Sequence, residues 1–271
     1  MADRNLDKYY RGGRFSTREG MILEIPPSGF DWSSVVPPVI DPFTKNSLTQ
    51  EFPLGTKLIY GERWFRYTRM GGVASVAGNV LQAAAPVAGH TTKALDIPVV
   101  GATSVNFTPT ATAITANEYQ DGFFVQDAGA TGIGYAYKIK SHPASAGTVA
   151  IDIALVDPIV VAIPAAGTGS LVQSPWGEPI QAVITTRTAP AVGVAQSVIT
   201  AAYYGWLLTH GPASVLTAGV VVVGDNVISP VGAAGAIGPE TTPLVVKATV
   251  VGRVMVVGAT GTWSTIFVTI E

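Results

Sequence analysis

The sequence contains no cysteine and has little charge. Without thiols the chain can form neither disulfides nor thiolate metal sites, so its stability has to come from packing or association. Only 13% of the 271 residues are charged, about half the usual share in soluble proteins, whereas 48% are hydrophobic and the mean hydropathy is +0.37. This composition predicts that copies of the chain or a partner cover part of its uncharged surface.

A strong net charge, a secretory signal and a membrane span are also missing. The formal net charge is −2 and the pI is about 5.9, which gives no long-range attraction to nucleic acid. The first twenty residues alternate in charge and have no apolar core, so they do not resemble a secretory signal. Residues 188–224 carry no Asp, Glu, Lys or Arg, but Pro190, Pro212, β-branched valines and the turn signal "GDN" predict buried strands there instead of a membrane helix.

Motifs of catalysis and of metal or cofactor binding are absent as well. The three histidines, His90, His142 and His210, form no metal-ligand spacing, and no G-x-S-x-G elbow occurs. The loop "DAGATGIGYAY" contains neither G-x-G-x-x-G nor G-x-x-x-x-G-K, and a β-rich segment follows it where a phosphate-binding loop would need a helix. Asp152 and Asp157 alone do not define a glycosidase pair. The sequence therefore predicts no enzyme, no cofactor and no metal.

What the sequence does contain is a series of short β-rich segments. From about residue 57 onward, runs such as "DGFFVQD", "GTVAIDIALVD", "PLVVKATVVGRVMVVG" and "WSTIFVTIE" are each bounded by Gly, Pro, Asp or Asn. Alternation in "TVAIDIALVD" places Val149, Ile151, Ile153 and Leu155 on one face. With 30 glycines and 19 prolines for turns, these segments predict an all-β fold of barrel-like or sandwich-like modules.

Two stretches of the chain resemble each other. An offset of 141 residues aligns "RWFRYTRMGGVASVAGNVLQ" with "YYGWLLTHGPASVLTAGVVVVGD", placing Phe65 on Trp206 and Thr68 on Thr209. This repeat predicts a β-rich domain over residues 55–271 with two related modules, about 55–140 and 190–271, joined by further strands. Residues 203–225 are expected to form a strand, a Gly-Pro turn and a second strand, with Trp206 in a module core or a subunit interface.

Only two segments are helical candidates, "NSLTQEF" and "GGVASVAGNVLQAAAP". Three internal glycines disfavour a helix in the second segment, since each costs about 1 kcal/mol. The repeat favours a strand–turn–strand element there.

The sequence of residues 1–54 predicts that this segment forms an extended N-terminal arm. Proline pairs and other prolines disfavour helix in its second half, and its apolar content is too high for a solvated tail. We expect aromatic anchors to attach the arm to a neighbouring subunit or partner: Tyr10, Phe15, Phe30 and Trp32. Basic residues also recur among the first eighteen positions, which would suit a single-stranded nucleic acid or an acidic protein groove; intervening acidic residues dilute them, and no direct nucleic-acid binding is expected.

Four segments carry a family resemblance: "YGERWFRYTRMGGVASVAGNVLQ", "NEYQDGFFVQDAGATGIGYAYKIKSHPASAG", "IDIALVDPI" and "YYGWLLTHGPASVLTAGVVVVGDNV". Together, over about residues 54–271, they resemble virion structural proteins of tailed bacteriophages, of the capsid decoration (head-stabilising or cement) type. The resemblance implies a homotrimer that is made in the host cytoplasm and caps the outside of the virion's capsid, with the major capsid protein as its partner. The chain departs from the smallest decoration proteins in its length and its repeat.

Other functions remain open at this point. A major capsid, tail-tube or fibre-associated virion protein would share the β-rich, self-assembling character, although the long helix of the common major capsid fold is missing. A carbohydrate-binding β domain would need exposed aromatic residues around a groove, for which Trp176 and Trp263 are the suggestive residues.

Overall fold

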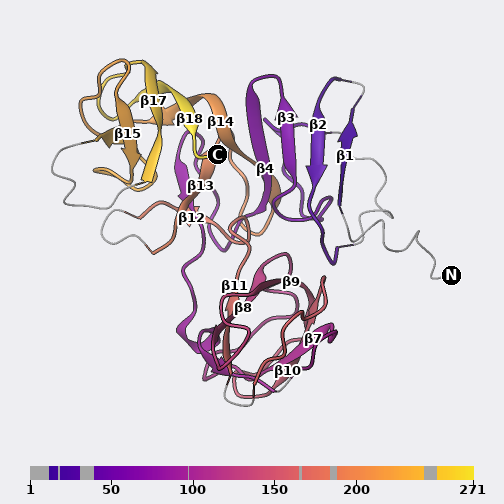
Figure 1. Cartoon of the computed structure of the whole chain (residues 1–271). Helices are drawn as coiled ribbons and strands as arrows, with labels where there is room; N and C mark the ends of the chain where they lie inside the picture. The colour runs from indigo at the N-terminus through magenta and orange to yellow at the C-terminus, as the bar shows by residue number, and fades with distance from the viewer. Residues whose placement is uncertain are drawn as a thin grey trace. The chain divides into compact units, whose positions relative to one another are not determined.

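The computed structural model describes residues 12–17, 19–30, 40–96, 98–164, 167–183, 188–240 and 249–271 (Figure 1). Within these ranges the chain forms eighteen β-strands and one short 3-10 helix, η1 (Ala88–His90). The predicted all-β fold is confirmed. Neither helical candidate forms a helix: residues 46–52 contain bends and a bridge from Ser47 to Tyr204, and residues 71–86 contain turns and the strand β5 (Val80–Gln82).

The chain divides into two compact units, which are described separately. Unit 1 contains Pro86–Ser174 together with residues 26–30, and unit 2 contains Gly13–Ile25, residues 40–85 and Pro175–Glu271. Most of unit 1 is thus an insertion between two parts of unit 2. The division differs from the predicted boundaries at residues 54, 140 and 190, because strands far apart in the sequence pair within one sheet.

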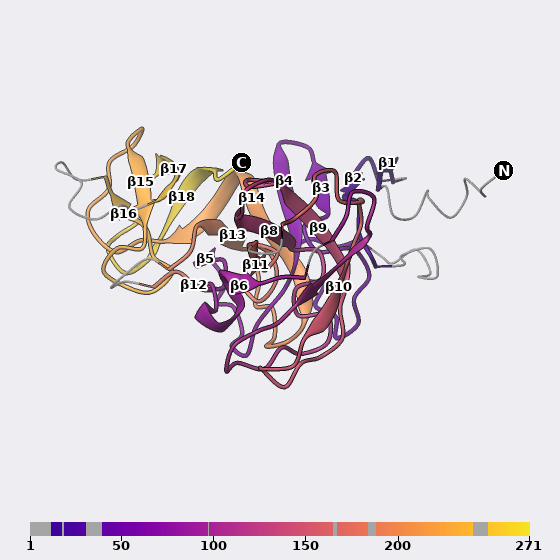
Figure 2. The ribbon, with the colours of Figure 1, turned by 60° about the horizontal axis from the view of Figure 1, so that its bottom comes forward.

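Unit 2 is built on a twelve-stranded antiparallel sheet. Its main path runs β1-β2-β3-β4-β14-β18-β17-β15-β16, and β13 joins β14 to β5, which also pairs with β12 (Figures 1 and 2). The remaining strands of this sheet are β1 (Gly13–Ser16), β2 (Ile22–Ile25), β3 (Lys57–Tyr60), β4 (Arg63–Arg69), β12 (Ile180–Gln181), β13 (Ala191–Ala195), β14 (Tyr204–Leu216), β15 (Asn226–Ser229), β16 (Gly238–Pro239), β17 (Thr249–Val256) and β18 (Trp263–Thr269).

Unit 1 is a six-stranded sheet that curls on itself. The strands follow the order β6-β11-β8-β9-β10-β7, and Leu95, directly after β6, forms a bridge with Phe107 of β7, so the two ends of the sheet meet. These strands are β6 (Lys93–Ala94), β7 (Ser104–Phe107), β8 (Phe123–Ala128), β9 (Ala136–Ser141), β10 (Ile151–Leu155) and β11 (Thr168–Val172).

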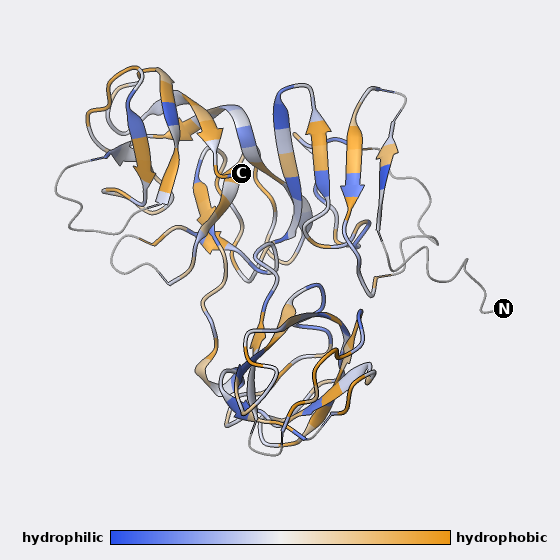
Figure 3. Cartoon of the chain, in the orientation of Figure 1, coloured by the Kyte–Doolittle hydropathy of each residue, from blue (hydrophilic) through white to orange (hydrophobic). Residues whose placement is uncertain are grey.

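Side-chain alternation gives each unit its buried face, and hydrophobic residues follow the strands of both units (Figure 3). In β10, Ile151, Ile153 and Leu155 are buried and Asp152 is exposed, as the alternation predicts. Val149 was expected on the same face but is exposed, because it precedes the strand. In β18, Ser264, Ile266 and Val268 are buried between exposed or half-buried neighbours.

The Gly-Pro step in the middle of residues 203–225 does not make the predicted turn. It lies inside β14, a continuous strand of 13 residues. Tyr204–His210 pair with β4, and His210–Leu216 pair with β18, so β14 changes its partner at this step. Gly211 has φ +101°, a left-handed value that glycine adopts without a β-carbon clash. Pro212 lies beyond the last residue paired with β4, so its missing N–H costs no hydrogen bond to that strand.

The two similar stretches of the sequence are neighbours in one sheet. β4 and β14 pair antiparallel, with Tyr67 opposite Trp206 and Phe65 opposite Leu208. Both strands therefore contribute to the same core of unit 2. The internal resemblance corresponds to adjacent strands, each with an aromatic residue on the buried face.

Described parts of the predicted arm belong to these units. β1 and β2 form a hairpin, and Leu23 of β2 pairs with Leu58 of β3. Phe52 is buried and packs edge-on against Tyr67. Residues 1–11 and 31–39 lie outside the described residues.

Among the described residues, no helix has the length and apolar character needed to cross a membrane.

Removing a buried side chain of β10 should destabilise unit 1. Ile153 has no exposed surface, so Ile153→Ala is expected to cost about 2–5 kcal/mol through lost burial and the cavity it leaves. The matched change Val149→Ala, at an exposed site, should cost less than about 0.5 kcal/mol. Urea unfolding, monitored by hydrogen exchange of unit 1 amides, measures the loss of stability in both variants. Equal losses would contradict the assignment of Ile153 to the buried face and of Val149 to the surface.

Candidate functional site

The predicted contact residues lie in different environments. Trp206 is 4% exposed in β14 and packs against Tyr67 and Phe52, with ring centroids 5.0 Å and 5.7 Å apart. It therefore fills the core of unit 2, one of its two expected positions. Phe15 is 38% exposed on β1, and Phe30 is half-buried in unit 1. Tyr10 and Trp32 lie outside the described residues.

The structure does not bring Phe15 and Trp206 together. Strands β2, β3 and β4 separate β1 from β14 in the sheet order. Of these two residues, only Phe15 presents a substantial surface to a partner.

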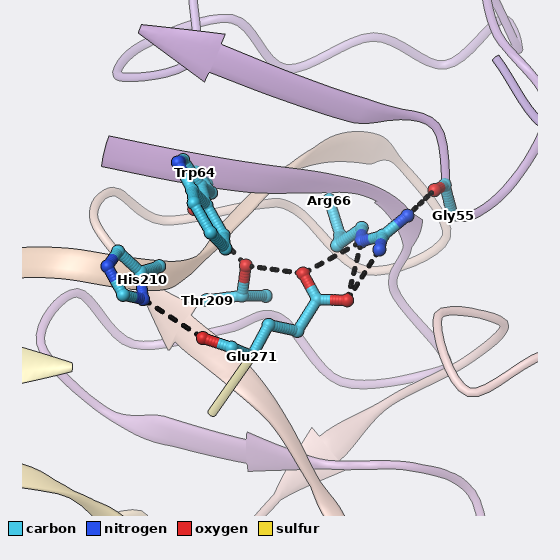
Figure 4. Close-up of polar contacts among 6 residues, drawn as sticks. All are labelled: Gly55, Trp64, Arg66, Thr209, His210 and Glu271. Atoms are coloured by element: carbon cyan, nitrogen blue, oxygen red, sulfur yellow. Dashed lines mark hydrogen bonds and ion pairs between the residues drawn. The ribbon is translucent and has the colours of Figure 1, made fainter. Parts of the chain in front are cut away.

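Three strands of unit 2 converge on a polar cluster that we call the Glu271 clasp (Figure 4). Arg66 Nε lies 3.0 Å from both carboxylate oxygens of Glu271, and its Nη2 lies 2.5 Å from Oε1. Arg66 also donates to the Gly55 carbonyl at 2.7 Å. Thr209 Oγ1 donates to Glu271 Oε2 at 3.0 Å, and His210 Nδ1 donates to the Glu271 main-chain oxygen at 2.9 Å.

Sheet register explains why these residues meet. Arg66 lies on β4 and His210 on β14, and His210 is the residue of β14 that is paired with both β4 and β18. Glu271 follows β18 by two residues, and its N–H points to the Thr209 carbonyl at 3.3 Å. The clasp thus ties the end of β18 to β14 and to β4.

Cations and aromatic rings stack beside the clasp. Lys57 Nζ lies 3.6 Å from the centroid of the Trp64 ring, and Trp64 stacks on His210 at 4.2 Å. The Arg66 guanidinium lies 4.9 Å from the ring centroid of Trp176. Such contacts hold long cationic side chains in place and contribute about 0.5–1 kcal/mol each at partly exposed sites.

Glu271 is held as a carboxylate. Burial alone would raise its pKa, but the hydrogen bonds and charge of Arg66, with the Thr209 hydroxyl, lower the pKa below its ordinary value of 4.5. Because Arg66 and Thr209 together occupy both oxygens, the group is suited to fixing the strands and poorly suited to accepting a proton from a substrate.

Unit 1 contains a second polar cluster, built around two buried histidines. His90 Nδ1 lies 2.6 Å from the Tyr119 hydroxyl, and Nε2 lies 3.1 Å from the Thr112 carbonyl. His142 Nδ1 lies 2.8 Å from the Pro143 carbonyl, and Nε2 accepts the Tyr119 N–H at 3.0 Å. Since carbonyls only accept, Nε2 of His90 and Nδ1 of His142 carry the protons.

These histidines have no ring nitrogen left for a metal. Burial lowers the pKa of His142 below its ordinary value of 6.5 and so favours the neutral ring. In the part of the chain that the structure describes, no three His, Cys, Asp or Glu side chains are grouped as a metal site would need. The cluster ties loops of unit 1 together.

Unit 2 also carries a group of exposed apolar side chains, the apolar tip. Gly224 N–H donates to the Val254 carbonyl at 2.9 Å, and Val254 N–H donates to the Asp225 carbonyl at 3.0 Å. These bonds join the turn before β15 to the end of β17, from which the chain turns into β18. The members of the tip are at least 45% exposed: Val220, Val222, Val223, Met255, Val256, Val257 and Trp263.

Sequence reasoning missed the clasp and the tip. The valine run at 220–223 was taken as part of a buried strand, but residues 220–225 form a turn region after β14 and only Val221 is buried. Arg66 and Glu271 are 205 positions apart, and no local pattern signals that pair. The sequence signal that could have revealed the tip is the position of the valine run directly before the turn residues Gly224 and Asp225.

Comparisons with known proteins give no match: no protein-family model, no curated protein and no solved structure is similar to this chain.

Neutralising Glu271 should change how stability depends on pH. Its lowered pKa means that the ionised clasp stabilises the fold above about pH 4.5 and that this contribution is lost as pH falls through the folded-state value. Glu271→Gln is expected to cost about 1 kcal/mol near pH 7 and much less near pH 3. Urea unfolding at both pH values measures the difference; a gap that does not shrink on acidification would contradict the ionised clasp.

Protonation of His142 should loosen unit 1. A lowered histidine pKa means that its stabilising contribution is present above about pH 6.5 and is lost as pH falls through the folded-state value. The protonated ring can no longer accept the Tyr119 N–H. We expect the exchange protection of the Tyr119 amide, corrected for intrinsic rates, to fall severalfold between about pH 7.5 and 5.5. The Leu155 amide, bonded to the Thr103 carbonyl, is the internal control, and an equal fall at both would contradict a local effect.

Proposed function

We propose that this chain is a structural protein of a tailed-phage virion and that it binds the outside of the capsid as a decoration protein. The proposal assigns it no catalytic step and no cofactor. Its partners would be further copies of itself, as a homotrimer, and the major capsid protein. The resemblance of the four sequence segments motivates the virion assignment, and the surface of unit 2 supports an assembly role.

The observation that carries the proposal is the apolar tip. Seven apolar side chains are exposed on the segment before β15, around the end of β17 and at the start of β18. Burying apolar surface stabilises an association by about 25 cal/mol per Å², and large exposed apolar patches mark interaction sites. In a chain with only 13% charged residues, little electrostatic repulsion opposes contact between copies.

A decoration protein needs a second surface for the capsid, and β1 supports that role. β1 ends the sheet order of the described strands, and all four of its residues are exposed. Edge strands can add a strand from a partner through main-chain hydrogen bonds. Phe15, 38% exposed on this strand, would contribute an aromatic contact to the capsid.

The tip should control the assembly state. We expect light scattering to give a mass of three times 28.0 kDa for the chain, and Val256→Asp to shift it to the monomer, because a buried unpaired carboxylate opposes the contact. Val149→Asp, at an exposed valine of unit 1, is the matched control and should leave the trimer intact.

Electron microscopy of the concentrated protein separates decoration from the other virion roles. Discrete trimers are expected. Closed shells or tubes of pure protein would overturn the decoration role in favour of a shell or tube protein, and a wild-type monomer would contradict self-assembly through the tip.

A further inference from the structure

Unit 1 includes a short segment that is distant in sequence from the strands of unit 1. Residues 26–30, "PPSGF", directly follow β2 of unit 2 but belong to unit 1. They form no strand. We call this segment the strap and the residues of unit 1 that receive it the strap site.

The centre of the strap is fully buried. Ser28 has no exposed surface, and its hydroxyl donates to a carboxylate oxygen of Asp121, which is itself 2% exposed. The same Ser28 oxygen accepts the Phe30 N–H at 2.9 Å. Both hydrogen-bonding directions of the hydroxyl are therefore used, as a buried polar group requires.

The strap site is shaped by unit 1 itself. Asp121 has φ +64°, a left-handed conformation that aspartate tolerates. Its N–H donates to the Ile139 carbonyl at 3.2 Å, and Lys138 Nζ donates to its carbonyl at 3.2 Å. These contacts fix the main chain of Asp121 without help from the strap.

Glycine is required at the next strap position. A β-carbon on Gly29 would overlap the main-chain carbonyl of Lys140, and main chain cannot move aside as a flexible side chain can. The site therefore selects a serine hydroxyl for its carboxylate and a glycine for close approach of the two backbones. This is the chemistry of sequence-specific peptide recognition.

The core of unit 1 does not include the strap. Its cluster of buried hydrophobic residues extends from Leu95 to Leu171, and the sheet order is complete with β6 to β11. The strap adds hydrogen bonds to unit 1 but contributes no residue to this hydrophobic cluster. Segments attached in this way open locally at lower cost than the core.

We propose that unit 1 is a peptide-binding module whose strap site recognises a short uncharged Pro-Ser-Gly peptide, and that the chain's own strap is its resident, separable ligand. The strap docks on folded unit 1 and leaves it without unfolding the core. This inference stands on the contacts of Ser28, Gly29 and Asp121 and is independent of the virion role.

The test uses the full-length chain and a fluorescein-labelled peptide with the sequence of residues 26–30. In the wild type the resident strap occupies the site, so the peptide should bind weakly. Gly29→Val displaces the strap and should tighten peptide binding at least tenfold by fluorescence polarisation. Gly72→Val is the matched control, because Gly72 has open space around its β-carbon position, and it should behave as wild type.

Specificity is tested on both partners. A peptide in which Ser28 is replaced by Ala should bind the Gly29→Val chain at least tenfold more weakly. Adding Asp121→Asn to that chain should have a similar effect, since asparagine keeps the left-handed conformation but not the charge.

Separability has its own measurement. In Ser28→Ala, amide exchange at Gly122 and Asp121 should accelerate while exchange at Ile153 stays unchanged. The proposal is overturned if the folded Gly29→Val chain binds the peptide no better than wild type. It is overturned equally if Gly29→Val or Ser28→Ala unfolds the core of unit 1, because the strap would then be part of that core.

Discussion

The pairing of β14 with two different strands is the constraint on which unit 2 depends. β14 hydrogen-bonds β4 over its first half and β18 over its second. Through β4 it is connected to β3, β2 and β1, and through β18 to β17, β15 and β16. Both faces of its first half are buried, with Trp206 and Leu208 on one face and Leu207 on the other. The Glu271 clasp fastens β4, β14 and β18 where β14 changes partner. The single strand β14 thus joins β1–β4 to β15–β18. The Gly-Pro step inside β14 permits its change of partner from β4 to β18.

Local features of this fold follow from the sequence, whereas its long-range pairing does not. Alternation identified the buried face of β10, because side chains on a strand point to opposite sides at every second residue. The Gly-Pro pair at residues 211 and 212, in contrast, was misread as a turn. Glycine and proline mark a break in regular pairing, and only the identity of the neighbouring strands decides whether that break is a reversal or a change of partner. Residues 86–174 read as a continuation of the strand series, and nothing local shows that they form a unit inserted into another.

The candidate surfaces show a similar limit. The low charge indicated an associating protein, but it did not say where the contact lies. Trp206 was predicted to lie in a core or an interface because large aromatic residues anchor both. Its burial within unit 2 shows that it belongs to the core. The tip was hidden in a valine run that reads equally well as a buried strand. Arg66 and Glu271 meet only because β4 and β18 both pair with β14, and two residues 205 positions apart leave no local pattern. Ser28 and Gly29 read as an ordinary loop until their partners in unit 1 are known.

The insertion of unit 1 has a consequence for the order in which the chain folds. β5 precedes the insertion and β12 follows it, yet Gln82 and Ile180 are paired across the two strands. Bringing these residues together from an unfolded chain closes a loop of about a hundred residues, at an entropic cost of about 4 kcal/mol plus a constant. If the inserted strands collapse first, their own closed sheet shortens the flexible path to a few residues at each end. The assembly of the large sheet is therefore expected to wait for the small one, so that the rate at which unit 1 forms limits the rate at which β5 finds β12.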